Sequence, residues 1–374
     1  MFIIHYLNKF DLPILSSLIL LPLISFFCIP IYLYNYGIVW QELIMLFVGW
    51  FVAGTGITVG YHRLFSHRSF KTYYLAEWLF MIAGSMALQN TILNWCSDHR
   101  LHHKKLDTKD DPYSITKGFF HAHIGWIVKK SGRKIIGVDD LKNKSAVKFQ
   151  TKYYWIISLF LSFALPFLIG CLYGRPFGGL LFGGVLRVTL VHHFTFFINS
   201  FCHFIGKRNY DINTSARDSW IMALFTFGEG YHNFHHKFQW DYRNGIKWYN
   251  FDPSKWIIKS LSYLKIAYGL RQASEASILK AKFDTINNKI KIILNRKVLI
   301  KDKYNTKITK ITNIVFLNLK SLKDLEQKYQ LIKFKNFSKR KELWYKKKIS
   351  LCKLELKNSF SSLMLIFLNL KNLS

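Results

Sequence analysis

Histidine clusters constrain this chain more than any other feature of its sequence. Nine histidines fall in four short stretches that lie far apart along the chain: His62 and His67; His99, His102 and His103; His203; and His232, His235 and His236. Two stretches repeat the spacing HxxHH, which a random placement of fourteen histidines would rarely produce twice. Imidazole is the commonest metal ligand among side chains, and clusters of it suit iron, copper, nickel or zinc. The fold must therefore bring four distant segments to one metal site.

The spacing of the histidines predicts their arrangement. Positions i, i+3 and i+4 of a helix lie on one face, so the three histidines of each HxxHH stretch can converge. His62 and His67 are five residues apart, and an ideal helix points such residues in different directions. Either the helix ends there or each ring reaches a different ion. Nine imidazoles are more than one tetrahedral or octahedral ion accepts, so we predict two metal ions.

Five apolar runs, each close to the length of one bilayer crossing, indicate an integral membrane protein. They cover residues 14–34, 38–61, 73–95, 153–173 and 178–204. If the run over 73–95 crossed the membrane, His67 and His99 would lie on opposite sides and the site would be split. That run also contains the polar residues Glu77, Gln89, Asn90 and Asn94, which are costly in hydrocarbon. We therefore predict an all-α membrane protein with four transmembrane helices in two hairpins, and an in-plane or re-entrant helix over 73–95.

Basic residues predict the orientation of these spans. The turns at the far ends of the two hairpins hold almost no Lys or Arg except Arg175, whereas the segments around the histidines are rich in both. Positive charge marks the cytoplasmic side of polytopic proteins. We therefore expect both termini and a histidine-rich helical cap to be cytoplasmic. The net charge of +32 is explained in this way, so we expect no nucleic-acid partner.

The two ends of the chain differ in character. The N-terminal apolar run lacks a basic leader and a clear cleavage site, so we interpret it as an uncleaved span within a membrane domain over 1–274. Residues 275–374 form a basic, Lys-rich extension that is helical or partly disordered. Its stretches 282–301 and 322–337 have the pattern of amphipathic helices on anionic lipid, although the biased composition is also typical of a weakly structured extension. The five scattered cysteines predict neither a disulfide framework nor a thiolate metal site.

Further residues near the clusters are candidates for supporting roles. Asn199 and His203 lie four residues apart on one helix face, either as a polar packing pair or as a ligand beside an amide that holds a metal-bound water. Four other histidines have a less distinctive spacing and are left out of the ligand set: His121, His123, His192 and His193.

Carboxylates beside the clusters are candidate partners of the imidazoles. A metal-bound imidazole commonly donates its second nitrogen to a carboxylate. Asp98 and Glu229 flank the clusters and are our candidates for this role, and Asp241 lies nearby. Asp110 and Asp111 also lie nearby, but we expect them to be surface charges.

At these clusters the sequence resembles the acyl-CoA desaturases, the stearoyl-CoA desaturase type of membrane fatty-acid desaturase. The matching stretches are GITVGYHRLFSHRSFK, NWCSDHRLHHK with DDPY, GFFHAHIGW, TLVHHFTFFINSFCHFIG, and FGEGYHNFHHKFQWDYR followed by FDPSKW. They cover roughly residues 40–272 and occur in the family's order, which makes the resemblance specific. Two features depart from the family pattern: the pair His192 and His193, and the long basic tail.

The resemblance implies a cytoplasmic di-iron centre that uses O2 and two electrons to insert a cis double bond into a saturated acyl chain. We expect a Δ9 bond in a C16 to C18 chain carried as a thioester. The family's ligands correspond to His62, His67, His99, His102, His103, His203, His232, His235 and His236, and its water-bridged ligand corresponds to Asn199.

The resemblance also implies substrate contacts and partners. Trp95 and Thr195 correspond to positions that bend the acyl tunnel, and Trp50 and Gly54 to its closed end. The basic residues Lys129, Lys130, Arg133 and Lys134 are placed to meet the phosphates of CoA or the acidic face of an acyl carrier protein, although such a run also suits membrane lipid. Because the sequence has no fused cytochrome b5 segment with HPGG, we expect a separate electron carrier of the cytochrome b5, ferredoxin or rubredoxin type, with its reductase.

Three other functions remain compatible with the sequence. Related histidine clusters serve in membrane di-iron hydroxylases and in desaturases of lipid-linked chains. A membrane protein that only carries metal or binds haem is a third alternative. Haem binding would place axial histidines within opposed spans, whereas eight of the nine histidines here lie at or beyond the predicted span ends.

Overall fold

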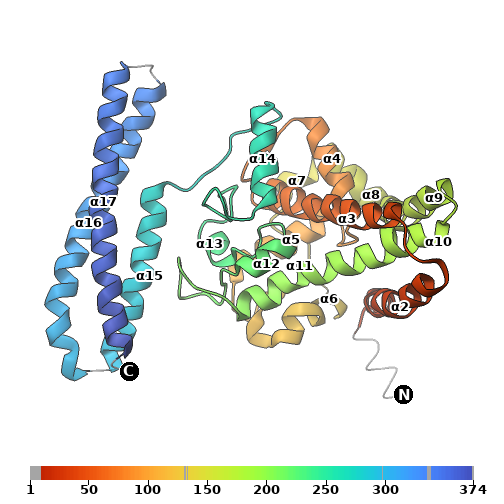
Figure 1. Cartoon of the computed structure of the whole chain (residues 1–374), viewed down its shortest axis with the longest axis horizontal. Helices are drawn as coiled ribbons and strands as arrows, with labels where there is room; N and C mark the ends of the chain where they lie inside the picture. The colour runs from red at the N-terminus through yellow and green to blue at the C-terminus, as the bar shows by residue number, and fades with distance from the viewer. Residues whose placement is uncertain (1–9, 130–131, 133, 297, 335–337, 373–374) are drawn as a thin grey trace. The chain divides into compact units, whose positions relative to one another are not determined.

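The structure is a computed structural model and is built almost entirely from helices (Figure 1). It describes residues 10–129, 132, 134–296, 298–334 and 338–372, with side chains for all of these except 298–303 and 334. The chain divides into two compact units. One comprises Met1–Lys207 with Thr214–Gln272, and the other comprises Arg208–Asn213 with Ala273–Ser374.

Four helices in the described part of the chain are long and apolar enough to cross a membrane. The first is α2 (Leu12–Tyr36), and the second joins α3 (Trp40–Thr55) to the π-helix η1 (Gly56–Ser66). The third joins α8 (Ser145–Leu159), η4 (Phe160–Ala164) and α9 (Leu165–Leu172), and the fourth joins α10 (Pro176–Gly178), η5 (Gly179–Leu186) and α11 (Arg187–Phe204). The predicted fold class of four apolar spans in two hairpins is confirmed.

The turns of the two hairpins lie against each other. Arg175, in the second turn, donates hydrogen bonds to the carbonyl oxygens of Tyr36 and Gly37 in the first, at 2.8 and 2.9 Å. Its guanidinium also pairs at 3.3 Å with Glu42, whose carboxylate is fully buried and accepts a hydrogen bond from the Tyr32 hydroxyl. The one basic residue of these turns therefore balances a buried acid.

The segment expected as one in-plane helix over 73–95 is broken in the middle. It forms α4 (Tyr74–Ser85) and the start of α5 (Ile92–Lys105), and the turn between them holds Leu88 and Asn90 at φ of +52° and +78°. The Asn90 amide donates to the Tyr154 hydroxyl, and the Ile92 amide donates to Gln150. Polar side chains thus satisfy the backbone groups that the break leaves unpaired.

Shorter elements complete this unit. They are η2 (Ile115–Lys117), η3 (His121–Gly125), α6 (Trp126–Val128), α7 (Asp139–Lys142), α12 (Trp220–Phe225), α13 (His232–Lys237) and α14 (Pro253–Tyr263). The strands β1 (Lys71–Thr72) and β2 (Ala267–Tyr268) pair antiparallel, with Lys71 opposite Tyr268. A buried apolar core that includes Ile57, Phe65, Ile92 and Cys96 packs η1 against α5. This packing brings the first two histidine clusters together.

The second unit contains three helices, α15 (Glu275–Arg296), α16 (Val298–Phe334) and α17 (Lys339–Asn372), which lie side by side (Figure 1). Their apolar residues form a core of their own, in which Ile290, Leu322, Leu356 and Leu363 are almost fully buried. The amphipathic faces expected on lipid are therefore turned toward one another.

Candidate metal centre

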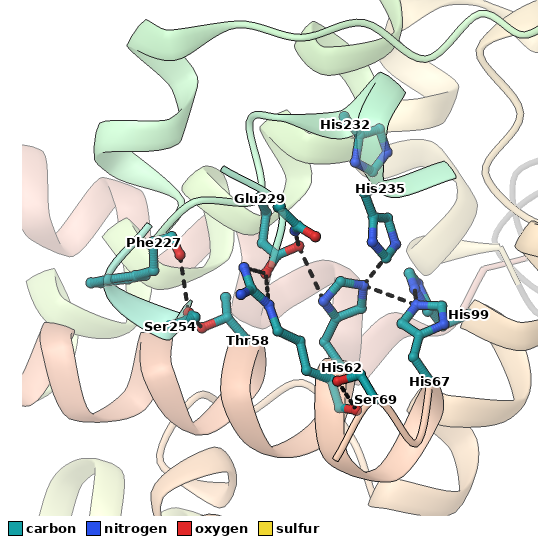
Figure 2. A network of polar contacts seen from close by, with 12 residues as sticks. Thr58, His62, His67, Ser69, His99, Phe227, Glu229, His232, His235 and Ser254 are labelled. Carbon is teal, nitrogen blue, oxygen red and sulfur yellow. Dashed lines mark hydrogen bonds and ion pairs between the residues drawn. The ribbon is translucent and has the colours of Figure 1, made fainter. Parts of the chain in front are cut away.

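The structure gathers the nine clustered histidines into two adjacent groups. His62, His67, His99, His103 and His235 form one group, and His102, His203, His232 and His236 form the other. Within each group, the nitrogen atoms able to bind a metal all lie within 4.8 Å of one another. Figure 2 shows the rings of His62, His67, His99 and His235 turned toward one another. The rings of His103 and His236 stack at 4.3 Å where the two groups meet.

His62 and His67 belong to the same group because the second span ends as a π-helix. In η1 the backbone bonds run from i+5 to i, and the amide of His67 donates to the carbonyl oxygen of His62 at 2.9 Å. This winding places residues five apart above one another, and the two Nε2 atoms lie 3.1 Å apart. The sequence left two possibilities, that the helix ends at this point or that each ring reaches a different ion. The helix ends at Ser66 and both rings belong to one group, so the first is correct and the second is wrong.

Each HxxHH helix contributes to both groups. On α5, His99 and His103 enter the five-histidine group, whereas His102 enters the four-histidine group. On α13 the assignment is reversed, because His232 and His236 share the four-histidine group and His235 joins the other. The first and last histidines of each motif are four residues apart and lie only 40° from each other around the helix. The middle histidine, His102 or His235, points to one side of them and so enters the neighbouring group. The two helices therefore interlock the groups.

Buried hydrogen-bond acceptors orient several imidazoles through Nδ1. The His102 Nδ1 lies 2.8 Å from an oxygen of Asp111, which is fully buried. The His203 Nδ1 lies 2.7 Å from the Ser215 hydroxyl, which donates its own proton to Asp107 and so accepts from the imidazole. Such contacts leave Nε2 with its lone pair directed into the group.

Glu229 links the centre to a buried charge network. One carboxylate oxygen lies 3.1 Å from the His62 Nδ1 (Figure 2). The other lies 2.9 Å from the guanidinium of Arg63, which also pairs with Asp252. Burial alone would raise the pKa of Glu229, but the charges of His62 and Arg63 outweigh it and lower the pKa to about 2. The carboxylate is therefore ionised at neutral pH.

The donor set fits a pair of metal ions. The pKa values of His99, His103 and His236 are lowered well below the ordinary value, mainly by burial and to a smaller extent by repulsion from the neighbouring imidazoles. These rings are therefore neutral. Neutral imidazoles present lone pairs, and the inward Nε2 atoms of His67 and His99 lie 2.8 Å apart. Lone pairs that converge in this way are stabilised by a cation between them.

The remaining candidates for support of the centre differ in position. Asp111 was expected to be a surface charge, and this prediction is wrong because its carboxylate is buried against His102. Asp110 is exposed, as expected, and pairs with Lys105 at the surface. Asn199 is half-buried one helical turn before His203. Asp98 is half-buried on α5, and Asp241 is buried and pairs with Arg243. The role of Asp98 as a partner of an imidazole stays a prediction.

A small cavity lies beside the centre, between α3 and α11. Its volume is about 10 Å³, and its lining includes Trp50, Gly54, Thr58 and Thr195. Thr58 stands one helical turn before His62. Three of the four residues predicted for the acyl tunnel therefore line one cavity.

Trp95, the fourth predicted tunnel residue, lies between that cavity and the histidines. Its ring stacks on His99 at 4.9 Å, and its indole N–H donates to Gln89, whose amide donates to Thr195. In the sequence, Gln89 is marked only as a polar residue that is costly in hydrocarbon. In the structure it joins Trp95 to the wall of the cavity.

The basic residues predicted near the acyl headgroup are only partly described. Lys129 and Lys134 are exposed, whereas Lys130 and Arg133 lie outside the described residues. The histidines left out of the ligand set lie outside both groups. His192 donates to the Ala87 carbonyl oxygen at 2.8 Å, and His123 lies 3.2 Å from His193.

Two residues that contact the imidazoles were not predicted from the sequence. Tyr113 lies 3.0 Å from the His99 Nδ1, and Ser215 reaches His203 from a loop after α11. The DDPY stretch that contains Asp111 and Tyr113 was the available signal, since it follows the first HxxHH at short distance. Ser215 has no such signal, because only the fold brings it to His203.

These features define a class: a largely helical integral membrane protein with two buried histidine groups, each able to hold a metal ion, beside an apolar cavity. A family model described as fatty acid desaturase matches residues 39–269, which include the whole centre. The chain belongs to the fatty acid desaturase family.

Relatives of known name agree with this assignment. The chain is 41% identical over 244 residues to the probable acyl-CoA desaturase of Schizosaccharomyces pombe, covering 64% of this chain and 51% of that protein. It is 39% identical over 243 residues to acyl-CoA desaturase 1 of Saccharomyces cerevisiae, covering 64% and 48%. It is 36% identical over 239 residues to human stearoyl-CoA desaturase, covering 62% and 66%. The chain thus spans about half the length of the two yeast relatives.

Proposed function

We propose that this protein is a fatty acyl desaturase, an oxidoreductase that inserts a cis double bond into a saturated acyl chain. The observation that supports it most is the pair of converging imidazole groups placed beside an apolar cavity within a frame of membrane-length helices. Membership of the desaturase family and the names of the relatives support the same reaction.

The nine histidines would hold two iron ions, with Asn199 holding a water beside the four-histidine group. When bound, the irons would supply the O2-dependent oxidation that removes two hydrogens from neighbouring methylenes. The residues of the chain would orient the ligands and exclude water. Glu229, Asp111 and Ser215 orient imidazoles, and the packed walls around Thr58 and Thr195 exclude water from the reacting carbons.

We propose a Δ9 product from a C16 or C18 chain. Bond position would follow from the distance between the bound headgroup and the centre, and chain length from the depth of the cavity beyond it. Among the relatives, an sn-1 stearoyl-lipid 9-desaturase and an acyl-CoA Delta(11) desaturase share 35% and 37% identity with this chain. Bond position is therefore what the experiment must measure.

We also propose a class of substrate and a class of electron partner. A thioester of CoA or of acyl carrier protein would place its charged group near Lys129, Lys130, Arg133 and Lys134. Electrons would come from a separate cytochrome b5, ferredoxin or rubredoxin type carrier and its reductase. The centre would face the cytoplasm, because basic residues are concentrated on its side of the membrane. Arg175 is the one basic residue of the hairpin turns on the opposite side, and its pairing with buried Glu42 gives it a structural role there.

Expression in a yeast strain that cannot make unsaturated fatty acids tests this proposal. Gas chromatography with mass spectrometry of the lipids should show a new cis-monounsaturated product, and derivatisation of the double bond gives its position. His102→Ala and His235→Ala, one from each histidine group, should abolish the product and lower the iron content. His121→Ala is the matched control and should keep both. Hydroxylated products, or equal unsaturation in all variants, would contradict the proposal.

A further inference from the structure

An aromatic ring forms part of the wall of the cavity beside the metal centre. The lining of this cavity includes Trp50 and Gly54 on α3, Thr195 on α11, and Phe227 from the loop that follows α12. The Phe227 ring lies 4.8 Å from the ring of Trp50, measured between centroids. Phe227 is almost completely buried, and it is the first residue of the stretch FGEGYHNFHHKFQWDYR. The ring therefore forms part of the inner wall of the cavity.

The Phe227 ring leaves no room for a side chain at position 54. A Cβ atom built at Gly54 would lie 2.0 Å from Cε2 of Phe227, a distance that no real contact allows. The ring thus occupies the space that any larger residue at position 54 would need. The size of the cavity at this point is set by two residues together, and Phe227 is the one that fills it.

The backbone holds Phe227 in an unusual conformation. Its φ is +52°, a left-handed value that is costly for a bulky residue and that persists only where surrounding contacts enforce it. The carbonyl oxygen of Phe227 accepts a hydrogen bond from the Ser254 hydroxyl at 3.0 Å, and Ser254 in turn lies 2.7 Å from the hydroxyl of Thr58 (Figure 2). Strained residues of this kind cluster at functional sites.

The same turn is tied to the metal centre. Gly228 follows at φ +99°, and a Cβ there would lie 2.4 Å from a carboxylate oxygen of Asp252. Glu229 comes next and faces His62. One short turn therefore fixes both the oriented imidazole and the aromatic wall of the cavity, so the distance between them is rigid.

We propose that the Phe227 ring is the stop that limits how long an acyl chain the cavity accepts. This inference deepens the proposed function and rests on it. A saturated tail offers only apolar contact, so the space in the cavity is what distinguishes chains of different length. One methylene too many in a tight apolar pocket changes selection by roughly 10-fold or more.

The test is the chain length of the products made by Phe227→Ala and Phe227→Leu in the desaturase-deficient yeast strain. Relative to the wild-type chain, we expect the ratio of longer to shorter unsaturated products to rise by about tenfold for Ala and by less for Leu. The bond position counted from the carboxyl carbon should not change, because the headgroup and the metals are not moved. Phe182→Ala, a buried phenylalanine packed against Tyr32 in another part of the spans, is the matched control and should leave the ratio unchanged.

Gly54→Ala gives an independent measurement if the Phe227 variants do not accumulate. Alone, it should push the ring into the cavity and lower the ratio of longer to shorter products. Combined with Phe227→Ala, it should be tolerated, because the clashing ring is gone. Unchanged ratios in the Phe227 variants, or in Gly54→Ala where those fail to accumulate, would overturn the inference. Absence of any unsaturated product from the wild-type chain would instead refute the proposed function.

Discussion

Asp111→Asn should weaken metal binding in one of the two histidine groups. The carboxylate is fully buried, and its Oδ1 lies 2.8 Å from the His102 Nδ1. Its Oδ2 accepts from the backbone amide of Asp107 at 3.1 Å. An asparagine can keep the first contact, but its NH2 group then faces the Asp107 amide, donor against donor. The substitution therefore removes a charge and leaves a buried donor unpaired.

The expected loss of metal affinity follows from the role of the carboxylate that is replaced, which orients His102. Changing a residue that orients a metal-bound imidazole typically costs 10- to 100-fold in metal affinity, which corresponds to about 1.4 to 2.7 kcal/mol. Because His102 belongs to the four-histidine group, the loss should fall on one ion. The purified variant should retain about one iron per chain at chelator concentrations at which the unsubstituted protein retains two.

The assay is iron content by mass spectrometry after equilibration with a graded chelator. Asp110→Asn is the matched control, since the neighbouring carboxylate is mostly exposed and pairs only with Lys105 among its described contacts. Thermal unfolding in detergent checks that both variants are folded. If Asp111→Asn and Asp110→Asn release iron at the same chelator concentration, the orienting role of Asp111 is wrong.

Three further predictions concern other contacts. Ser215→Ala removes the acceptor of the His203 Nδ1 and should weaken iron retention about tenfold in the same chelator titration. The pKa of Glu229 is lowered from 4.5 to about 2. Its ionised form therefore stabilises the fold above about pH 4.5, and this stabilisation is lost as the pH falls toward 2. Glu229→Gln should lower the unfolding temperature at pH 7 and remove that acid dependence. Gly178→Ala places a Cβ 1.9 Å from Glu42 and should destabilise the protein by about 1 to 3 kcal/mol, measured by thermal unfolding.

Each of these predictions has a contrary result. Unchanged iron retention in Ser215→Ala would mean that the serine does not orient His203. An acid-unfolding profile of Glu229→Gln that matches the unsubstituted protein would show that this carboxylate contributes no pH-dependent stability. Gly125→Ala is the control for Gly178→Ala, since its nearest neighbour would be 3.4 Å away. Equal unfolding temperatures for the two glycine variants would remove the argument from close packing.

Much of the fold was predictable because its signals are local. A helix that crosses a membrane needs a run of apolar residues, and such runs are visible in the sequence. The break between α4 and α5 was not predicted, because its cause lies elsewhere in the chain. Gln150 and Tyr154, some sixty residues later, supply the groups that satisfy the backbone at Ile92 and Asn90. Hydrogen bonds between distant residues leave no pattern in a single sequence.

The metal centre shows the same division. The sequence by itself determined which imidazoles were available and that they were too many for one ion, because spacing and number are properties of the chain. Only the tertiary structure decided their partition, through the π-helical turn that stacks His62 and His67 and through the offset that sends His102 and His235 to opposite groups. It also decided that Asp111 is a buried partner and that Phe227 lines the cavity. Burial and contact depend on which segments meet, and that is fixed by the packing of the whole domain.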